Sequence, residues 1–313
     1  MIRLASAIFI FALGACVTSP KNADTFTDAG VVSGSVMTEQ TCTFPGSSIW
    51  VMVDGQGECV RYFAAGLESA TPLVHVWFHG DRMMQSLSDG AAWVPRGWYN
   101  NNDPRTLQGY ADRDANKYGM LYIRYSRPGV YGSSGDHKER RLKREADIVD
   151  TALDALKARH GIERFALTGQ SGGGHVVASL LARRNDIVCA TITSGAVAVA
   201  QRNAIRGWST DATGYSNFYD PIDHVGDIPA DPRRRIFVVG DPRDSNVPFS
   251  TQVNYHKALT AAGHQAHLIK ADGKGSSRHG LSLAGFRVAK WCVDGVAPEE
   301  IQKRIGWSGG ASS

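Results

Sequence analysis

A serine, an aspartate and a histidine occur in the chain at positions from which they could together cleave an ester or amide bond. Ser171 lies in the run GQSGG, residues 169–173, which fits the pattern G-x-S-x-G. In this pattern a strand turns directly into a helix, and the serine hydroxyl is exposed at the strained apex. Glycines suit the neighbouring positions because a side chain there would collide with the strand or the helix. The spacing therefore predicts that Ser171 is a nucleophile.

The residues on either side of Ser171 have the composition that such a turn requires. Residues 165–168 form a short apolar run typical of a buried strand, and residues 176–181 are typical of an apolar helix. The backbone N–H of Gly172, at the start of that helix, could stabilise the oxyanion formed when a serine attacks a carbonyl. The alternatives are an ordinary glycine-rich turn and a dinucleotide-binding or phosphate-binding turn. No Lys-Ser/Thr pair follows the glycines, which argues against a phosphate loop.

His279 is the histidine whose position suits a general base. It follows the last predicted strand, residues 265–270, on a loop rich in Gly and Ser, and it completes the chain order Ser, Asp, His. The other histidines that compete for the role are predicted to lie in or beside strands (His75, His264, His267), in helices (His175, His256) or in a turn (His224).

The loop after the predicted strand 235–239 supplies the carboxylate. Its sequence, GDPRDSNVP at residues 240–248, contains Asp241 and Asp244. A catalytic triad needs a buried carboxylate that orients the imidazole and stabilises its charged form. Either aspartate meets this need, and the other would then cap a turn.

The elements that must position these residues alternate between strands and helices. Strands are predicted over residues 73–78, 120–125, 165–168, 186–194, 235–239 and 265–270, and helices over 105–118, 139–160, 251–262 and 281–291. This alternation predicts a parallel sheet covered by helices. Residues 49–53 and 59–64 are predicted to form a hairpin around the turn DGQG. Residues 195–231 are expected to be irregular and to cover the site, and 296–307 to add a terminal helix.

Taken together, these features resemble the α/β-hydrolase superfamily over about residues 73–293. The nearest likeness is to the serine esterase and peptidase branch with the prolyl-oligopeptidase and dienelactone-hydrolase relatives, carried by residues 240–248 and by YHKALTAAG at 255–263. The resemblance implies an α/β-hydrolase fold with a mostly parallel central sheet flanked by helices and an N-terminal antiparallel hairpin. It favours Asp244 over Asp241, because Asp244 has the family's spacing to the Val-Pro before the next helix. It also implies a second oxyanion N–H at or next to Asp81.

Three residues are predicted to border the substrate. Gly80 would let the backbone come close to it. Arg127 and Tyr131 lie on the loop after the strand 120–125, and ligands of such sheets bind at the carboxyl ends of the strands. Arg127 could hold a substrate carboxylate or brace the loop. The aromatic residues of the preceding segment (Trp93, Trp98, Tyr99) are either a lid margin or packing residues.

The expected activity is that of a serine hydrolase that cleaves a carboxylic ester or an amide through an acyl-enzyme, with no cofactor and no metal. An ester is favoured, because no β-propeller precedes the domain as it does in prolyl-oligopeptidase enzymes. The alternatives are a prolyl-oligopeptidase-like peptidase and a non-catalytic surface binding protein on a hydrolase scaffold. The partner is a small ester or peptide. The net charge of +4 and the absence of a basic cluster interleaved with aromatics exclude a nucleic-acid partner.

The N-terminus is predicted to direct export. Residues 1–15 form a signal peptide with Arg3 before an apolar run that is too short to span a bilayer. Residues 13–16, LGAC, resemble a bacterial lipobox, which implies lipidation of Cys16 and a lipid-anchored envelope protein. The alternative is a plain secretory peptide and a periplasmic or secreted protein. Membrane contact is expected only through Cys16. Residues 16–40 would be a flexible tether, and 41–313 one domain.

Five cysteines and one charge run complete the sequence-based predictions. Without Cys16 an even number remains, which in an exported protein indicates disulfides. The favoured pairs are Cys42 with Cys59 and Cys189 with Cys292, and two buried thiols are the alternative for the second pair. The dense charge run at residues 138–145 is predicted to form a solvated helix face.

Overall fold

The protein is built on one eight-stranded sheet with the strand order β1-β2-β6-β3-β7-β8-β9-β10. The computed structural model describes residues 26–67, 71–85, 92–95, 99–100 and 102–310. The strands are β1 (Ser48–Val53), β2 (Gln56–Ala65), β3 (Thr71–Phe78), β6 (Tyr122–Tyr125), β7 (Ile162–Gln170), β8 (Ile187–Thr193), β9 (Arg235–Gly240) and β10 (Ala266–Lys270). β2 pairs antiparallel with β1 and β6, and the other neighbours pair parallel. A small antiparallel pair, β4 (Met83–Gln85) and β5 (Trp93–Pro95), lies apart from this sheet.

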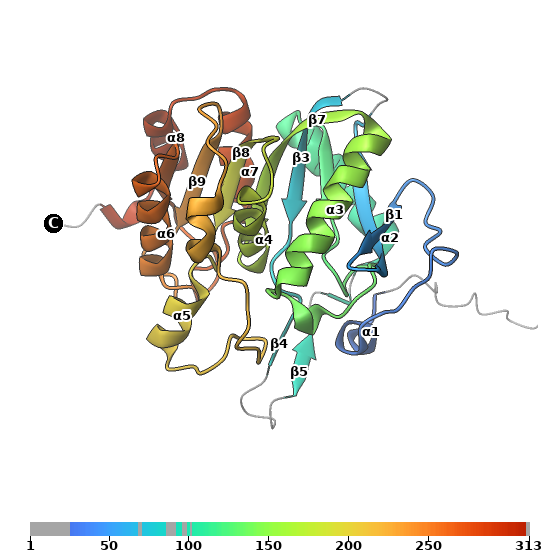
Figure 1. Cartoon of the computed structure of the whole chain (residues 1–313). Helices are drawn as coiled ribbons and strands as arrows, with labels where there is room; N and C mark the ends of the chain where they lie inside the picture. The colour runs from blue at the N-terminus through green and yellow to red at the C-terminus, as the bar shows by residue number, and fades with distance from the viewer. Residues whose placement is uncertain (1–25, 68–70, 86–91, 96–98, 101, 311–313) are drawn as a thin grey trace, which may run out of the picture.

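Helices cover both faces of the sheet (Figure 1). α3 (Lys143–His160), α4 (Gly172–Leu181) and α6 (Phe249–Ala261) lie on one face, and α2 (Pro104–Tyr118), α7 (Ser282–Val293) and α8 (Pro298–Ile305) lie on the other. The remaining helices are α1 (Asp28–Ser33), α5 (Val199–Arg206) and the short 3-10 turns η1 (His137–Glu139), η2 (Pro221–Asp227) and η3 (Ser308–Gly310). The mostly parallel sheet between helices and the N-terminal hairpin confirm the predicted fold class.

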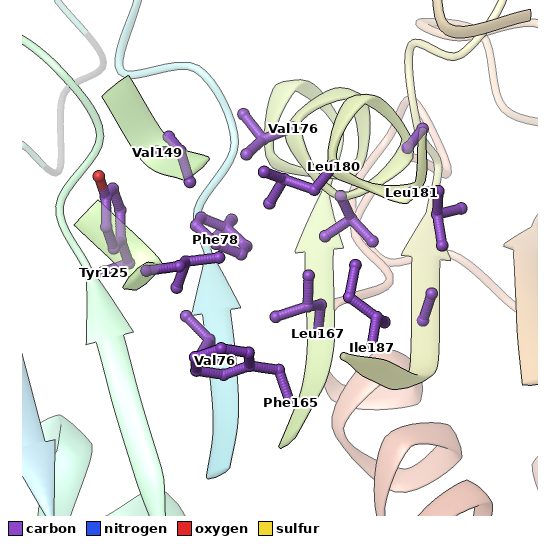
Figure 2. Packing of buried hydrophobic residues seen from close by; sticks show 14 of the residues in the cluster. Val76, Phe78, Tyr125, Val149, Phe165, Leu167, Val176, Leu180, Leu181 and Ile187 are labelled. Atoms are coloured by element: carbon purple, nitrogen blue, oxygen red, sulfur yellow. The ribbon is translucent and has the colours of Figure 1, made fainter. Parts of the chain in front are cut away.

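The core fixes the carboxyl end of β7, where Ser171 lies. Phe78 on β3, Phe165 and Leu167 on β7 and Leu180 on α4 are fully buried. Figure 2 shows these side chains between the two central strands and the helix layer above them. Each fully buried side chain of this size contributes about 1.5–3 kcal/mol to folding. Burial on both faces explains why the central strands are almost continuous apolar runs in the sequence.

The charge run at residues 138–145 does not form the predicted solvated face. α3 begins at Lys143 rather than at residue 139, after η1 and a residue with positive φ, Arg141 at 70°. Arg140, Arg141 and Glu145 are buried. Arg140 and Arg141 lie inside the protein because they pair with the carboxylates of Asp81 and Asp211. Glu145 lies inside because it pairs with Arg127.

The predicted tether is wrong for the part of it that the structure describes. Phe26 and Val31 are buried in an apolar cluster with Trp77 and Tyr131, and Val31 belongs to the short helix α1. Ser35 pairs with Gly135 through a backbone bridge. Phe26 and Val31 are apolar residues in an otherwise polar segment, and their burial anchors that segment to the domain. The predicted signal peptide, residues 1–15, and Cys16 lie outside the described residues.

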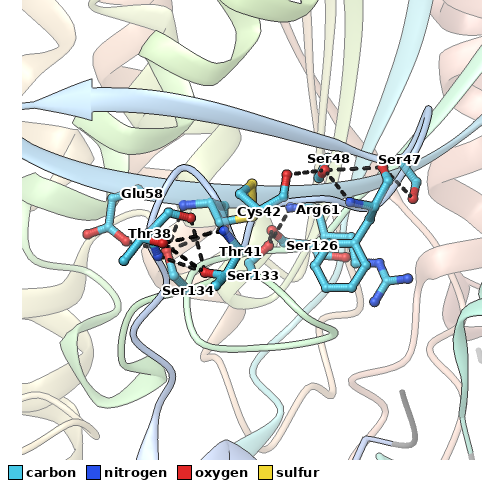
Figure 3. The surroundings of a disulfide bond; sticks show 12 residues. Thr38, Thr41, Cys42, Ser47, Ser48, Glu58, Arg61, Ser126, Ser133 and Ser134 are labelled. Carbon is cyan, nitrogen blue, oxygen red and sulfur yellow. Dashed lines mark hydrogen bonds between the residues drawn. A yellow bond between two sulfur atoms is a disulfide. The ribbon is translucent and has the colours of Figure 1, made fainter. Parts of the chain in front are cut away.

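Both predicted disulfides are confirmed. Cys42 is bonded to Cys59 of β2, and Figure 3 shows this bond among serine and threonine hydroxyls of neighbouring segments. Cys189 of β8 is bonded to Cys292 of α7 and joins the sheet to a covering helix. Disulfides are typical of proteins that fold in an oxidising compartment. Of the helices within the described ranges, none is long and apolar enough to cross a membrane.

Removal of the buried disulfide is expected to destabilise the domain. Cys189 and Cys292 are 103 residues apart, so their bond closes a long loop that restricts the unfolded chain. Replacing both by Ala should lower the free energy of unfolding by about 2–5 kcal/mol, measured by urea titration. The Cys42–Cys59 bond closes a loop of only 17 residues. Replacing both of these cysteines by Ala should therefore lower the free energy of unfolding by less, on the chain-entropy argument. An equal or larger loss for the short loop would contradict that argument.

Candidate active site

Ser171 occupies the strained turn between β7 and α4. Its backbone has φ 56° and ψ −118°, a conformation that L-residues rarely adopt. A Cβ added at Gly169 would lie 2.0 Å from the carbonyl oxygen of Gly173, and one added at Gly173 would lie 2.1 Å from that of Phe78. Only glycine therefore fits on either side of the serine. This is the geometry that the G-x-S-x-G pattern predicts.

His279 and Asp244 form the pair that the sequence analysis favoured. The His279 Nδ1 lies 2.8 Å from the Asp244 Oδ2. The other oxygen of Asp244 accepts hydrogen bonds from the backbone N–H groups of Asn246 and Val247, at 2.8 and 3.0 Å. A carboxylate can only accept, so the Nδ1 of His279 carries a proton, and in the neutral imidazole the lone pair is on Nε2. That Nε2 is buried and has no hydrogen-bond partner among the described residues.

Asp241, the alternative acid, is engaged elsewhere. Its carboxylate accepts hydrogen bonds from the Arg243 side chain and from the backbone N–H of Gly273, the latter at 2.8 Å. Burial raises the pKa of the Asp241 carboxyl, but the hydrogen bonds from Arg243 and Gly273 lower it below its usual value. Asp241 thus fastens the loop after β9 to the loop after β10, and Asp244 alone of the two contacts His279.

Gln170 joins the serine turn to the histidine loop, and the sequence analysis did not identify it. Its amide Nε2 donates to the carbonyl oxygen of His279 at 2.8 Å. Its Oε1 accepts from the backbone N–H of Leu281 and from the hydroxyl of Thr193, both at 3.0 Å. One side chain adjacent to Ser171 therefore holds the backbone on both sides of Gly280. Its place as the first variable residue of G-x-S-x-G was the signal available in the sequence.

Gly80 and Asp81 lie against the serine turn, where the predicted second oxyanion donor should be. A Cβ added at Gly80 would lie 3.3 Å from that of Ser171, and one added at Gly172 would lie 2.0 Å from the Asp81 Oδ1. Gly172 is the first residue of α4, so its backbone N–H has no acceptor within the helix. The loop after β3 and the start of α4 thus face each other directly beside Ser171.

Three arginines hold the carboxylate of Asp81. Asp81 Oδ1 lies 3.0 Å from Arg127 Nη1, and Asp81 Oδ2 lies 3.1 Å from Arg140 Nε and 2.7 Å from Arg141 Nη1. Burial raises the pKa of the Asp81 carboxyl, but the charges of Arg141, Arg140 and Arg127 outweigh it and hold the pKa well below its usual range. Asp81 therefore stays ionised, and its loop is fixed in place.

Arg127 braces this loop and does not face a substrate, so its assignment as a substrate-binding residue is wrong. Its side chain is fully buried. It binds Asp81, the carboxylate of Glu145 at 2.8 Å and the carbonyl oxygen of His79 at 3.2 Å. Of the two roles that the sequence left open, the structure supports the bracing role.

Tyr131 is likewise a packing residue, which corrects its assignment to the substrate site. It is 4% exposed, and its ring stacks on Tyr99 and meets the edges of Phe26 and His79. Tyr99 is buried with it, and Trp98 lies outside the described residues. Trp93 on β5 is only half-buried and lies under the guanidinium of Arg140, 5.2 Å from the ring centroid.

Comparison with known proteins identifies the fold. Neither a protein-family model nor a curated protein matches the sequence. Among solved structures, the Pf2001 esterase of Pyrococcus furiosus is similar with a TM-score of 0.55 and 12% identity, covering 87% of this chain and 97% of that one. Est1E from Butyrivibrio proteoclasticus has a TM-score of 0.51 and 14% identity, covering 80% and 99%.

An acylaminoacyl peptidase of Pyrococcus horikoshii is also similar, with a TM-score of 0.52, 16% identity and coverage of 83% of this chain. The match spans only 39% of the peptidase. The likeness shows that the chain has the α/β-hydrolase fold.

Loss of the Gln170 amide should displace His279 while the rest of the fold survives. Gln170→Ala should lower kcat by about 10²-fold, the effect expected when a catalytic group shifts by about 1 Å, and should change KM little. Gln170→Glu keeps the acceptor for Leu281 but loses the donor to His279, so it should fall between Ala and the wild type. The measurement is ester hydrolysis, with circular dichroism as the control for folding. A purely structural role would instead reduce the folded fraction and leave kcat per folded molecule unchanged.

Breaking the arginine cluster should cost stability. Arg141 also binds Asp211 at 2.7 Å, so Arg141→Met leaves the buried Asp211 and the partly buried Asp81 without their closest cation. The free energy of unfolding should fall by about 3–5 kcal/mol in urea titration. Arg304→Met breaks an exposed pair with Glu300 on α8 and should cost about 1 kcal/mol or less. Equal losses in the two variants would show that the cluster contributes no more than a surface ion pair.

Proposed function

We propose that the protein is a serine hydrolase that cleaves a carboxylic ester. The observation that carries the proposal is the pairing of His279 with Asp244 on a loop that Gln170 holds beside the strained Ser171. A histidine that a carboxylate orients, on a loop tied to the turn of a half-buried serine, is the arrangement that activates a serine hydroxyl once the two side chains meet.

The proposed reaction proceeds in two halves. The Nε2 of His279 takes the proton of Ser171 as the hydroxyl oxygen attacks the ester carbonyl carbon, and Asp244 stabilises the imidazolium. The imidazolium then protonates the departing alcohol oxygen, and an acyl-enzyme remains on Ser171. A water molecule, deprotonated by His279, attacks the acyl carbon and releases the acid and the free serine.

The backbone N–H groups of Gly172 and Asp81 are the proposed donors to the oxyanion. They lie on the two segments that meet beside Ser171, and donors fixed in advance stabilise the charge without reorganisation. The Asp81 carboxylate would repel an adjacent oxyanion, and the three guanidinium groups around it offset that repulsion. Gly80 would border the substrate, because it lies against Ser171 and has no side chain that would fill the space between them.

Cleavage of an amide bond is the second candidate. One similar structure is an acylaminoacyl peptidase, and the chemistry of the two reactions differs only in the leaving group. The Pf2001 esterase and Est1E are also among the similar structures, which supports the ester. No cofactor enters either reaction.

The proposed site of action is outside the cytoplasm. The two disulfides support export, and the lipobox-like run ending at Cys16 supports a lipid anchor in a bacterial envelope. Mass spectrometry of the mature N-terminus would detect the lipid.

Labelling by a fluorophosphonate tests the proposed nucleophile. The wild type should be labelled at Ser171, and Ser171→Ala and His279→Ala should lose labelling, because the first lacks the nucleophile and the second its base. Asp244→Asn should lower kcat for a neutral ester by about 10⁴-fold, since the imidazole then adopts the wrong tautomer. Peptide mapping of the labelled protein gives the site.

Asp241→Asn is the matched control. It removes the same charge from the same loop but should retain most of the labelling rate, because Asp241 does not contact His279. Absence of labelling in a folded wild type would reject the hydrolase and favour the non-catalytic binding protein. Loss of activity in Asp241→Asn but not in Asp244→Asn would reverse the assignment of the acid.

A further inference from the structure

Two arginines of α5 converge on one residue of the loop that carries Asp244. Arg202 Nε and Nη2 lie 3.3 and 3.1 Å from the carbonyl oxygen and the Oδ1 of Asn246. Arg206, one helical turn later, donates its Nη2 to the same carbonyl oxygen at 2.9 Å, and also to that of Ser245. Two positive side chains are thus fixed at the same point of the loop.

This point borders the reaction centre. The backbone N–H of Asn246 donates to the Asp244 oxygen that does not face His279, at 2.8 Å. On the other side, the segment leading into α5 bonds to the serine turn, since the N–H of Ala196 lies 3.4 Å from the carbonyl oxygen of Ser171. Figure 1 shows α5 beyond the carboxyl ends of the strands, where ligands of such sheets bind.

An aromatic ring holds the two guanidinium groups in place. The Cζ atoms of Arg202 and Arg206 lie 5.1 and 5.9 Å from the ring centroid of Trp208. The N–H of Trp208 bonds to the carbonyl oxygen of Asn203 at 2.9 Å, which fixes the end of α5. Arginines stacked on an aromatic ring lose little entropy when they bind a ligand.

Among the described residues the pair has only one counter-ion, which is distant and shared with another arginine. The carboxylate nearest to Arg202 is Asp211, whose Oδ1 is 4.0 Å away and whose Oδ2 is already bound to Arg141 at 2.7 Å. Within the described ranges Arg206 has no ion pair. Like charges four residues apart on a helix repel each other. Burial and the charges of Arg141 and Arg206 lower the pKa of Arg202 to about 10, against partial compensation by Asp211.

Donors of the pair are available to a ligand. The side chain of Arg202 is 9% exposed, and its Nη1 makes no hydrogen bond to any described residue. Arg206 is exposed. Arg127, the arginine that the sequence had suggested for a substrate carboxylate, is enclosed and neutralised by its own acids.

We propose that Arg202 and Arg206 bind a carboxylate of the substrate, so that the protein prefers esters with an anionic group remote from the cleaved bond. This inference rests on the proposed hydrolase function and specifies its substrate class. A guanidinium pair that is positioned in advance and is only partly neutralised, by the distant Asp211, gains most from a planar carboxylate, which two N–H groups can bind at once.

The test compares two esters that differ only in charge: the mono-para-nitrophenyl ester of suberic acid, and the same compound with its free carboxyl methylated. The wild type should prefer the anionic ester by about 10- to 100-fold in kcat/KM, the effect of a hydrogen-bonded charge pair, and added salt should reduce the preference. Arg202→Met with Arg206→Met should abolish the preference by raising KM for the anionic ester, whereas a shift of the Asp244 loop would lower kcat for both esters equally. Arg202→Lys should keep part of it, and Arg304→Met should keep all of it.

The outcomes separate this inference from the function on which it rests. Hydrolysis of both esters without a preference for the anionic one would overturn the carboxylate site and leave the hydrolase intact. Failure of fluorophosphonate labelling would reject the hydrolase. In that case calorimetry of suberate binding to Ser171→Ala would still decide the site: binding that the double Met change abolishes supports it, and absence of binding overturns it. Circular dichroism of every variant verifies that it is folded.

Discussion

The close contact between the serine turn and the end of β3 is the constraint on which the site depends. The backbone of α4 begins so near the carbonyl oxygen of Phe78 that a single methyl group at Gly173 would not fit. This contact holds Ser171 in a conformation that an L-residue otherwise avoids. The energy for it comes from the core below, where β3, β7 and α4 bury their apolar side chains together.

The loops around the serine are fixed by polar contacts from different parts of the chain. Gln170 holds the histidine loop through its amide, and Asp244 is held by two N–H groups of its own loop. Three arginines hold the Asp81 loop. These groups are largely removed from water, so a group that lost its partner would lower the free energy of unfolding. The hydrogen bonds also leave few alternative arrangements. The site is therefore rigid before a substrate arrives.

Charge is distributed unevenly around this rigid site. The charges around Asp81 almost cancel, because two of its three arginines also pair with Glu145 and Asp211. Arg202 and Arg206 on α5 stand outside that balance and bind the loop that carries Asp244. In the proposed function the α/β-hydrolase fold supplies the reaction, while the segment between β8 and β9 supplies charge beside it, which is how one fold serves many substrates.

Local signals in the sequence were enough to predict the elements and the order of the proposed catalytic residues. Alternating apolar runs predicted the parallel sheet, and the glycines around Ser171 predicted the turn, because these signals are local and each has a steric or hydrophobic cause. The even number of cysteines predicted two disulfides, and the favoured pairs are those of the structure. The choice of Asp244 needed a family's spacing in addition to the residues themselves.

The positions of the charged side chains depend on how the chain packs. The run at residues 138–145 has the composition of a solvated helix, yet Arg140 and Arg141 are buried because Asp81 and Asp211 arrive from distant segments to pair with them. For the same reason Arg127 braces a loop and α5 presents Arg202 to the site. In the sequence Gln170 is only a variable position of the G-x-S-x-G pattern, and the folded chain places its side chain against the backbone of His279. Long-range pairing of polar groups has no periodicity that a sequence displays, so the packed chain alone determines it.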